Sequence, residues 1–92
     1  MSYILVFSKT ALDDIEKHKK SGDKTTLKKI EKLLNELIEH PTTGTGKPEL
    51  LKFESVGLYS RRINQKHRLI YSVEIQIVTV HVLNLWNHYG DK

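Results

Sequence analysis

Eight residues of this 92-residue sequence could together carry out acid–base chemistry on a charged substrate. They fall in three segments: GKPELLK, SRRINQKHR and the last five residues, HYGDK. A carboxylate can accept a proton, an imidazole or phenol can donate one, and guanidinium and ammonium groups can hold phosphate oxygens. The residues are Lys47, Glu49, Lys52, Arg61, Arg62, Arg68, His88 and Tyr89.

This set matches what is needed to cleave RNA through its own 2′-hydroxyl group. A base must take the 2′ proton, cations must hold the phosphate as charge develops, and an acid must protonate the leaving 5′ oxygen. Glu49 is the candidate base, the arginines are candidate phosphate ligands, and His88 or Tyr89 is the candidate acid. Each residue alone is a weak signal, so the hypothesis depends on their occurring together.

Other kinds of site find less support in the sequence. There are no cysteines for a disulfide or a thiolate zinc site, and the five histidines form no HxxxH or HxH pair. We therefore expect no metal and no cofactor, a structural role for His81, and solvated positions for His18 and His40. The stretch GTGKPE is not a Walker loop, because Pro41 and Pro48 occupy positions that need glycine and serine or threonine.

The positive charge is concentrated in one part of the chain. The net charge is +4, and residues 44–71 alone hold six cationic side chains, including all three arginines, against two acids. This pattern suits a polyanion such as nucleic acid, although a solvated basic sheet edge would show it too. The N-terminal apolar run, Tyr3 to Phe7, is too short for a signal peptide or a membrane span, so we expect a cytoplasmic protein.

The periodicity predicts one α+β domain over residues 1–92. A strand at Tyr3 to Phe7 precedes a helix capped by Ser8, and SGDK separates it from a second helix that ends near His40. Three strands follow a turn-rich loop: LYSRRIN, RLIYSV and IQIVTVHVLNL, with a turn near Glu74. We expect a small antiparallel sheet with the two N-terminal helices packed on one face.

Three motifs in this order resemble one known family. GKPELL, GLYSRRINQKHRLIYSV and the terminal HYGDK look like the YoeB/Txe branch of the RelE-type toxins, and the resemblance covers nearly the whole chain. Those toxins are ribosome-dependent mRNA endonucleases of bacterial type II toxin–antitoxin systems. The resemblance implies a small antiparallel sheet with two helices, no metal, and a 2′,3′-cyclic phosphate product.

The resemblance also implies a role for each matching residue. Glu49 would be the general base, Arg68 would stabilise the scissile phosphate, and His88 would be the general acid. Tyr89 would orient or stack the substrate. The remaining matches hold the RNA backbone or, for His67, support RNA binding: they are Lys47, Lys52, Arg62 and His67.

Two features depart from the family pattern. Trp86 is bulkier than the residue expected there, and it could stack on a base or pack against the helices and shift His88. The chain also continues past Tyr89 with Gly90, Asp91 and Lys92, which could fold over the site.

The implied partners are a Phd/YefM-type antitoxin, the 70S ribosome with its A-site mRNA, and a second copy of the chain in a homodimer. Two other functions remain open. A ParE-like toxin of the same fold inhibits DNA gyrase without nuclease chemistry, but it would not need Glu49, Arg68 and the terminal His-Tyr together. A catalytically inactive RNA-binding module is the third reading, if Trp86 misplaces His88.

Overall fold

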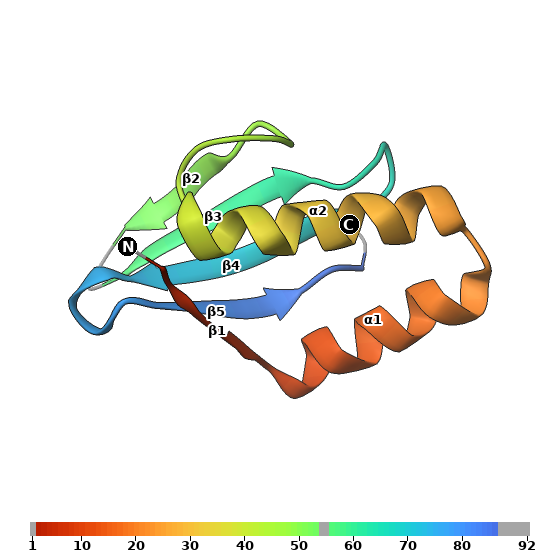
Figure 1. Ribbon diagram of the computed structural model, residues 1–92, viewed down its shortest axis with the longest axis horizontal. Helices are drawn as coiled ribbons and strands as arrows, with labels where there is room; N and C mark the ends of the chain where they lie inside the picture. The colour runs from red at the N-terminus through yellow and green to blue at the C-terminus, as the bar shows by residue number, and fades with distance from the viewer. Residues whose placement is uncertain (1, 54–55, 87–92) are drawn as a thin grey trace.

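The computed structural model describes residues 2–53 and 56–86 (Figure 1). Its elements follow the chain in the order strand, two helices, then four strands, with a short 3₁₀ helix before the last strand. The elements are β1 (Ile4–Phe7), α1 (Lys9–Ser21), α2 (Lys24–Glu39), β2 (Glu49–Phe53), β3 (Gly57–Arg62), β4 (Arg68–Glu74), the 3₁₀ helix (Ile75–Ile77) and β5 (Thr79–Asn84). In these described ranges no helix is long and apolar enough to span a membrane.

The strands form one five-stranded sheet in the order β1-β5-β4-β3-β2. Strands β2 to β5 are an antiparallel meander, as expected, but β1 pairs parallel with β5. The sheet is therefore mixed rather than wholly antiparallel. It also has one more strand than the sequence indicated, because Glu49–Phe53 pairs with β3 as a separate edge strand.

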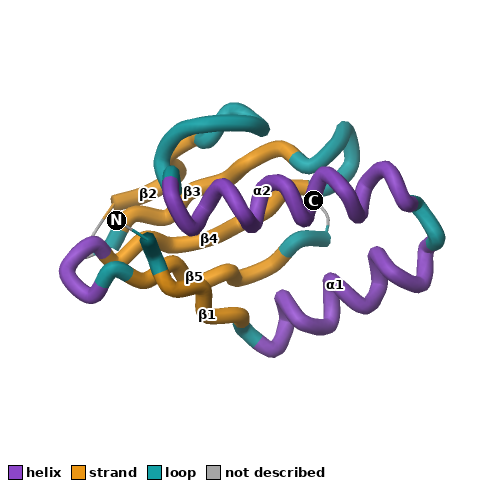
Figure 2. Tube along the Cα trace, in the orientation of Figure 1, coloured by secondary structure: helices purple, strands orange, loops and turns teal. Residues whose placement is uncertain are grey.

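Both helices pack into the same hydrophobic core, which confirms the α+β prediction (Figures 1 and 2). Ala11 on α1 and Leu33 and Leu37 on α2 are fully buried against the sheet. The sheet contributes alternate residues of its central strands, since successive side chains point to opposite faces. These buried sheet residues include Leu69, Tyr71, Val73, Val80 and Val82.

The helix boundaries follow from capping residues, of which the sequence analysis named Ser8. The Ser8 hydroxyl accepts a hydrogen bond from the Ala11 amide at the start of α1. Gly22 ends α1 in the left-handed conformation (φ 76°), and the Asp23 side chain accepts from the Thr26 amide to begin α2. The two helices are consequently joined by a tight turn.

The last strand begins later than predicted. Ile75–Ile77 forms a 3₁₀ helix, and Val78 has a positive φ of 51°, so β5 starts at Thr79 rather than at Ile75. The alternation of valines there suggested a longer strand. The reversal between β4 and β5 uses these apolar residues, and Ile75 and Ile77 are consequently exposed.

Candidate active site

The sheet face opposite the helices carries most of the predicted site, and we call it the open face. Directly paired residues on neighbouring strands share a face, so the strand register shows which side chains belong together. Glu49 pairs with Ser60 and Ser60 with Ile70, while Arg62 pairs with Arg68. The open face comprises Glu49, Lys52, Leu58, Ser60, Arg62, Arg68, Ile70, Ser72 and His81.

Glu49 and Arg68 are both neighbours of Ser60, from the strands on either side of β3. Glu49 is the residue opposite Ser60 on β2, and the Nη1 of Arg68 donates to the Ser60 hydroxyl from β4 at 3.0 Å. Ser60 is 1% exposed, so this hydrogen bond fixes the guanidinium at the floor of the open face. Ser60 was not among the predicted site residues, although the alternation of LYSRRIN already put it on the same face as Arg62.

A β-bulge brings Lys52 to the same face as Glu49. Residues three apart in a regular strand point to opposite faces. The register of β2 against β3 shifts between Leu50 and Lys52, so that Lys52 pairs with Leu58 on the open face. Bulges near active sites commonly redirect a side chain in this way.

Two arginines are directly opposite each other on the open face. Arg62 ends β3 and Arg68 begins β4, and the two are register partners. Two guanidinium groups at paired positions on one face could both contact the oxygens of one anion. The pair is therefore a candidate site for a phosphate group.

The loop before β2 positions Lys47 beside Arg62. The Arg62 amide donates to the Gly46 carbonyl at 2.7 Å, which closes the loop against the end of β3. A side chain at Gly46 would place its Cβ only 2.8 Å from the Arg62 carbonyl oxygen. Gly46 (φ 85°) therefore permits an approach that another residue would prevent, and Lys47 follows it with a positive φ of 50°.

Arg61 is not on the open face, and the prediction that it binds RNA is wrong. Its side chain is fully buried, pointing toward the helices, as expected for the residue between Ser60 and Arg62 in a strand. All five N–H donors of the guanidinium are used inside the protein. The acceptors are the Tyr71 hydroxyl, the Glu36 carboxylate and the carbonyls of His40, Thr43 and Thr45.

Glu36 completes this buried network from α2. Its carboxylate accepts from Arg61 at 2.9 Å and from both the amide and the hydroxyl of Thr45 at 2.7 Å. Partial burial alone would raise the pKa of Glu36, but the hydrogen bonds from Thr45 and the charge of Arg61 outweigh it and lower the pKa. Burial raises the pKa of Tyr71, whose hydroxyl donates to the Pro41 carbonyl. The network thus holds the loop that leads to Glu49.

His67 lies beside the open face in an aromatic cluster. Its ring centroid is 4.3 Å from that of Trp86 and 4.8 Å from that of His18. His67 is only 6% exposed, so it offers almost no surface to RNA, and its contribution is to packing. Trp86 is partly exposed and packs against both histidines, of which His18 belongs to α1, as in the alternative that places it against the helices.

His18 was expected to be solvated, and this prediction is wrong. It is 2% exposed, and its Nε2 lies 2.8 Å from the Leu85 carbonyl oxygen. His81 is partly exposed on the open face, where its Nε2 lies 2.6 Å from the Glu74 carboxylate, in keeping with a structural role. The predicted acid residues His88 and Tyr89, and the tail from Gly90 to Lys92, lie outside the described residues.

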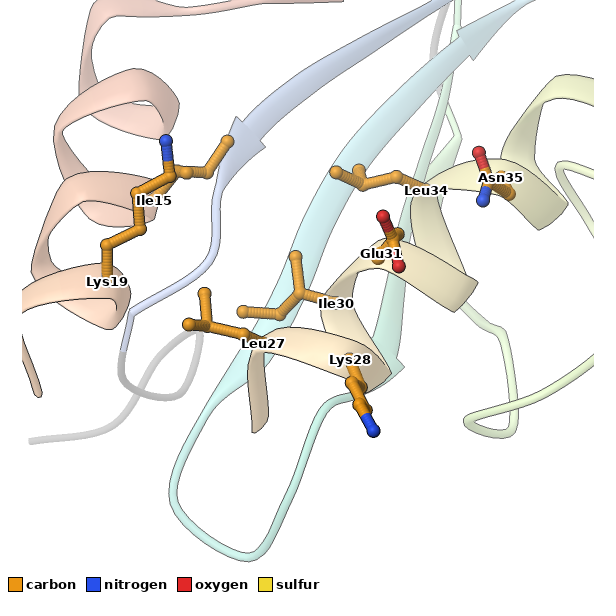
Figure 3. A pocket seen from close by; sticks show the side chains of 8 residues that line it. All are labelled: Ile15, Lys19, Leu27, Lys28, Ile30, Glu31, Leu34 and Asn35. Atoms are coloured by element: carbon orange, nitrogen blue, oxygen red, sulfur yellow. The ribbon is translucent and has the colours of Figure 1, made fainter. Parts of the chain in front are cut away.

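A separate groove lies on the helical side of the molecule, between α1 and α2 (Figure 3). Its volume is about 370 Å³, and Leu27 and Ile30 on α2 point across it toward Ile15 on α1. None of the predicted site residues lines it. The groove is apolar at its centre and belongs to a different surface from Glu49 and Arg68.

Comparison with known proteins identifies the family. Residues 7–89 match the family described as the YoeB-like toxin of bacterial type II toxin–antitoxin systems. The chain belongs to this family. The YoeB-like toxin described here is 41% identical to the toxin YoeB of Escherichia coli K12 over 69 residues, which cover 75% of this chain and 81% of that protein.

Solved structures of relatives share the fold of this YoeB-like toxin. A YoeB/ParE toxin from Agrobacterium tumefaciens aligns with a TM-score of 0.82 and 34% identity, covering 94% of this chain and 99% of that one. The YoeB dimer from Staphylococcus aureus aligns with a TM-score of 0.77 and 37% identity, covering 97% and 100%. A heterotetrameric YoeB–YefM toxin–antitoxin complex from S. aureus aligns with a TM-score of 0.74 and 37% identity, covering 97% and 100%.

Proposed function

We propose that this YoeB-like toxin is an endoribonuclease that cleaves mRNA on the ribosome and so inhibits translation. The observation that carries the proposal is that Glu49 and Arg68, from the strands on either side of β3, are both neighbours of Ser60 on the open face. A carboxylate and a fixed guanidinium on one exposed surface are the base and the phosphate ligand that attack by a 2′-hydroxyl requires.

In the proposed reaction Glu49 takes the proton from the 2′-hydroxyl of the nucleotide before the scissile bond. The O2′–P bond forms as the P–O5′ bond breaks, and Arg68 stabilises the charge on the phosphate oxygens. His88 donates a proton to the leaving 5′ oxygen, and Tyr89 orients the substrate. The products are a 2′,3′-cyclic phosphate and a 5′-hydroxyl, and no step calls for a metal ion.

Lys47, Lys52 and Arg62 surround this pair and would hold the RNA backbone. Lys47 and Arg62 are exposed, and neither forms an ion pair among residues 2–53 and 56–86. Such contacts neutralise phosphates and release counterions, so binding would weaken steeply with added salt.

The shape of the site supports a requirement for the ribosome. The open face is a sheet surface, and Glu49 is exposed on its edge strand. Each acid–base group increases the reaction rate by about 10²–10⁴-fold. The rest of the rate acceleration depends on holding the 2′-oxygen in line with the leaving oxygen. The ribosomal A site would impose that alignment on a flexible strand, and the toxin would then act in the cytoplasm.

We infer that an antitoxin controls the toxin by covering the same surface. Among the S. aureus relatives, YoeB is found in a complex with YefM and also as a dimer. An acidic, disordered segment that folds on binding would suit the cations of the open face. RNA and an antitoxin of the Phd/YefM type would then compete, and a homodimer is the other assembly to test.

The deciding experiment is cleavage of an mRNA paused on purified ribosomes by wild type and by Glu49→Gln. We expect cleavage only on ribosomes and a loss of about 10²–10⁴-fold in rate for Glu49→Gln. The matched control is Glu74→Gln, because Glu74 is also a carboxylate on a sheet strand but is paired with His81 of the open face. That variant should cleave at the wild-type rate.

Two additions sharpen the result. Cleavage should survive EDTA, provided that a sedimentation control shows intact ribosomes under the same conditions. If wild type cleaves no mRNA with or without ribosomes, the nuclease proposal is wrong. A gyrase supercoiling assay then tests the ParE-like alternative.

A further inference from the structure

A second pocket lies where α2, the loop before β2 and the hairpin of β3 and β4 come together. Its volume is about 430 Å³, which is within the range of pockets that bind small ligands. Each of the three segments contributes one cation to its lining: Lys29 from α2, Lys47 from the loop and Arg62 from the end of β3. No carboxylate is among the described residues that line it.

Two sets of hydrogen bonds hold the walls of this pocket against α2. On one side the Asn64 amide nitrogen donates to the Thr26 hydroxyl at 3.1 Å, which fixes the turn after β3. On the other side the amide and the hydroxyl of Thr45 both donate to the Glu36 carboxylate at 2.7 Å, which fixes the loop. At helical spacing Thr26, Lys29 and Glu36 lie along one side of α2, with Lys29 between the two contacts. The walls are therefore held in place by the fold itself.

The loop is also fixed at Lys47. The hydrogen bond from the Arg62 amide to the Gly46 carbonyl joins the loop to β3 directly before this lysine. Lys47 itself has a φ of 50°, in the left-handed region that residues with a Cβ seldom adopt. The fold holds it there, in a conformation in which Lys47 lines the pocket together with Lys29 and Arg62.

The three cations of the pocket are available to a ligand. Lys29 is half-buried, and like Lys47 and Arg62 it forms no ion pair among residues 2–53 and 56–86. Glu36, the acid of α2 that faces the same loop, is already bound by Thr45 and Arg61. A cleft lined by charge of one sign concentrates ligands of the opposite sign, and guanidinium and ammonium groups both bind phosphate oxygens.

We propose that this pocket binds a phosphodiester group of RNA through Lys29, Lys47 and Arg62. The inference rests on the proposed function, which supplies RNA as the ligand, and it adds Lys29 to the residues that hold RNA. The pocket adjoins the open face, because Arg62 belongs to both. Bound RNA would therefore extend from the open face around the end of β3 to α2. The phosphate comes either from the mRNA or from ribosomal RNA, and the experiment separates these sources.

The first test measures the salt dependence of binding for Lys29→Ala and Lys28→Ala. Lys28 is the matched control, because it is the adjacent lysine of α2 but lines the groove between α1 and α2 (Figure 3). The probes are ribosomes paused on mRNA and a free single-stranded RNA, both with 2′-O-methyl groups that block cleavage. For Lys29→Ala we expect the slope of log affinity against log salt to fall by about 0.7, and for Lys28→Ala no change. Between 50 and 200 mM potassium chloride, wild type would then lose about 3-fold more affinity than Lys29→Ala.

The two probes identify the source of the phosphate. A lower slope on both probes assigns the phosphate to the mRNA strand, and a lower slope on ribosomes alone assigns it to ribosomal RNA. An unchanged slope on ribosomes overturns the proposal.

Single-turnover cleavage of mRNA on paused ribosomes separates a binding residue from a structural one. Lys29→Ala should raise the half-saturating toxin concentration about 3–5-fold and leave the maximal rate unchanged, because Lys29 would touch no reacting atom. Lys29→Arg keeps the charge and should restore the wild-type concentration. A lower maximal rate for Lys29→Ala, together with unfolding at a lower urea concentration, would show a structural role and overturn the proposal.

A double variant tests whether Lys29 and Lys47 hold the same phosphate. Residues that share a ligand are coupled, so the affinity loss of Lys29→Ala/Lys47→Ala should differ by more than about 2-fold from the product of the single losses. Losses that multiply would mean two separate contacts and would overturn the shared pocket.

The outcomes distinguish this proposal from the nuclease. If wild type cleaves no mRNA but binds ribosomes with a slope that Lys29→Ala lowers, the nuclease is wrong and the pocket stands. If wild type cleaves and Lys29→Ala leaves the slope unchanged, only the pocket is wrong. If Lys29→Ala weakens binding of an antitoxin but not of ribosomes, the pocket takes an acidic protein segment, and the RNA proposal is overturned.

Discussion

At the scale of single residues, two neighbouring arginines have opposite uses. Arg61 is fully buried and satisfies three loop carbonyls, Glu36 and Tyr71, whereas Arg62 is exposed on the open face. A guanidinium is suited to the first position because its planar fork reaches several acceptors at once, and an ammonium cannot reproduce that geometry. The same residue type thus holds the fold together at one position and faces solvent at the next.

We predict that Arg61→Lys lowers the free energy of unfolding by about 2–4 kcal/mol, because it leaves buried acceptors unpaired. Arg62→Ala, the matched control, should change it by less than about 0.5 kcal/mol. Urea unfolding of both variants measures these values. Equal effects on stability would contradict the assignment of the two arginines to opposite faces.

For Arg62 we also predict an effect on ribosome binding. Arg62→Ala should weaken ribosome binding and reduce the slope of log affinity against log salt by about 1, as expected for one lost phosphate contact. Binding measured over a series of potassium chloride concentrations tests this. An unchanged slope would show that Arg62 does not contact phosphate.

At the scale of elements, α1 connects the C-terminal end of the last strand to the core. Its N-cap Ser8 donates to the Leu83 carbonyl at 2.6 Å, and Asp14 and His18 hold Leu85. Helix α1 must also end at a defined residue, because the chain reverses there and α2 packs beside α1. Gly22 provides that end, in a left-handed conformation and with open space around its Cα.

We predict that Gly22→Ala lowers the free energy of unfolding by about 1–2 kcal/mol, because a Cβ disfavours the left-handed conformation. No neighbouring atom lies within 4 Å of the Cβ that alanine would add, so the effect should come from backbone strain alone. Gly22→Asn should cost less, since asparagine tolerates this conformation. Thermal unfolding compares the two, and an asparagine variant as unstable as the alanine one would point to a different cause.

At the scale of the whole molecule, Glu36 links the helical layer to the loop that precedes the site. It accepts from Thr45 and from Arg61, so α2, the loop and β3 share one carboxylate. The pKa of Glu36 is lower in the folded chain than its ordinary value. A group of this kind stabilises the fold above its unfolded pKa of about 4.3, and this contribution is lost as pH falls through the lower folded pKa.

We predict that Glu36→Gln destabilises the protein by about 1–3 kcal/mol at pH 7, through the loss of charged hydrogen bonds. The difference from wild type should shrink as the pH is lowered below about 4.3. Urea unfolding from pH 7 to pH 3 measures it. Wild type and variant should both retain some acid sensitivity, because hydrogen bonds from Thr26 also lower the pKa of Asp23. A constant difference across this range would contradict the role given to Glu36.

Much of the molecule could be predicted from the sequence because the signals are local. Helical spacing from Leu27 to Ile38, the cap Ser8, the break at SGDK and the alternation of LYSRRIN depend on neighbours within a few residues. The same alternation correctly separated Ser60 and Arg62 from Tyr59 and Arg61. The motifs that resemble YoeB-like toxins identified the family for the same reason, since they are contiguous in the chain.

Only the tertiary structure decided which face of the sheet is covered. Period-two alternation shows that Arg61 and Arg62 point to opposite faces, but the packing of α2 determines that Arg61 is the buried one. The parallel pairing of β1 with β5, the bulge that returns Lys52 to the open face and the hydrogen bond between His18 and Leu85 are equally non-local. Each of these three features depends on packing or strand register between residues that are distant in the chain. A short sequence pattern could therefore indicate that these residues matter, but it could not predict their positions in the fold.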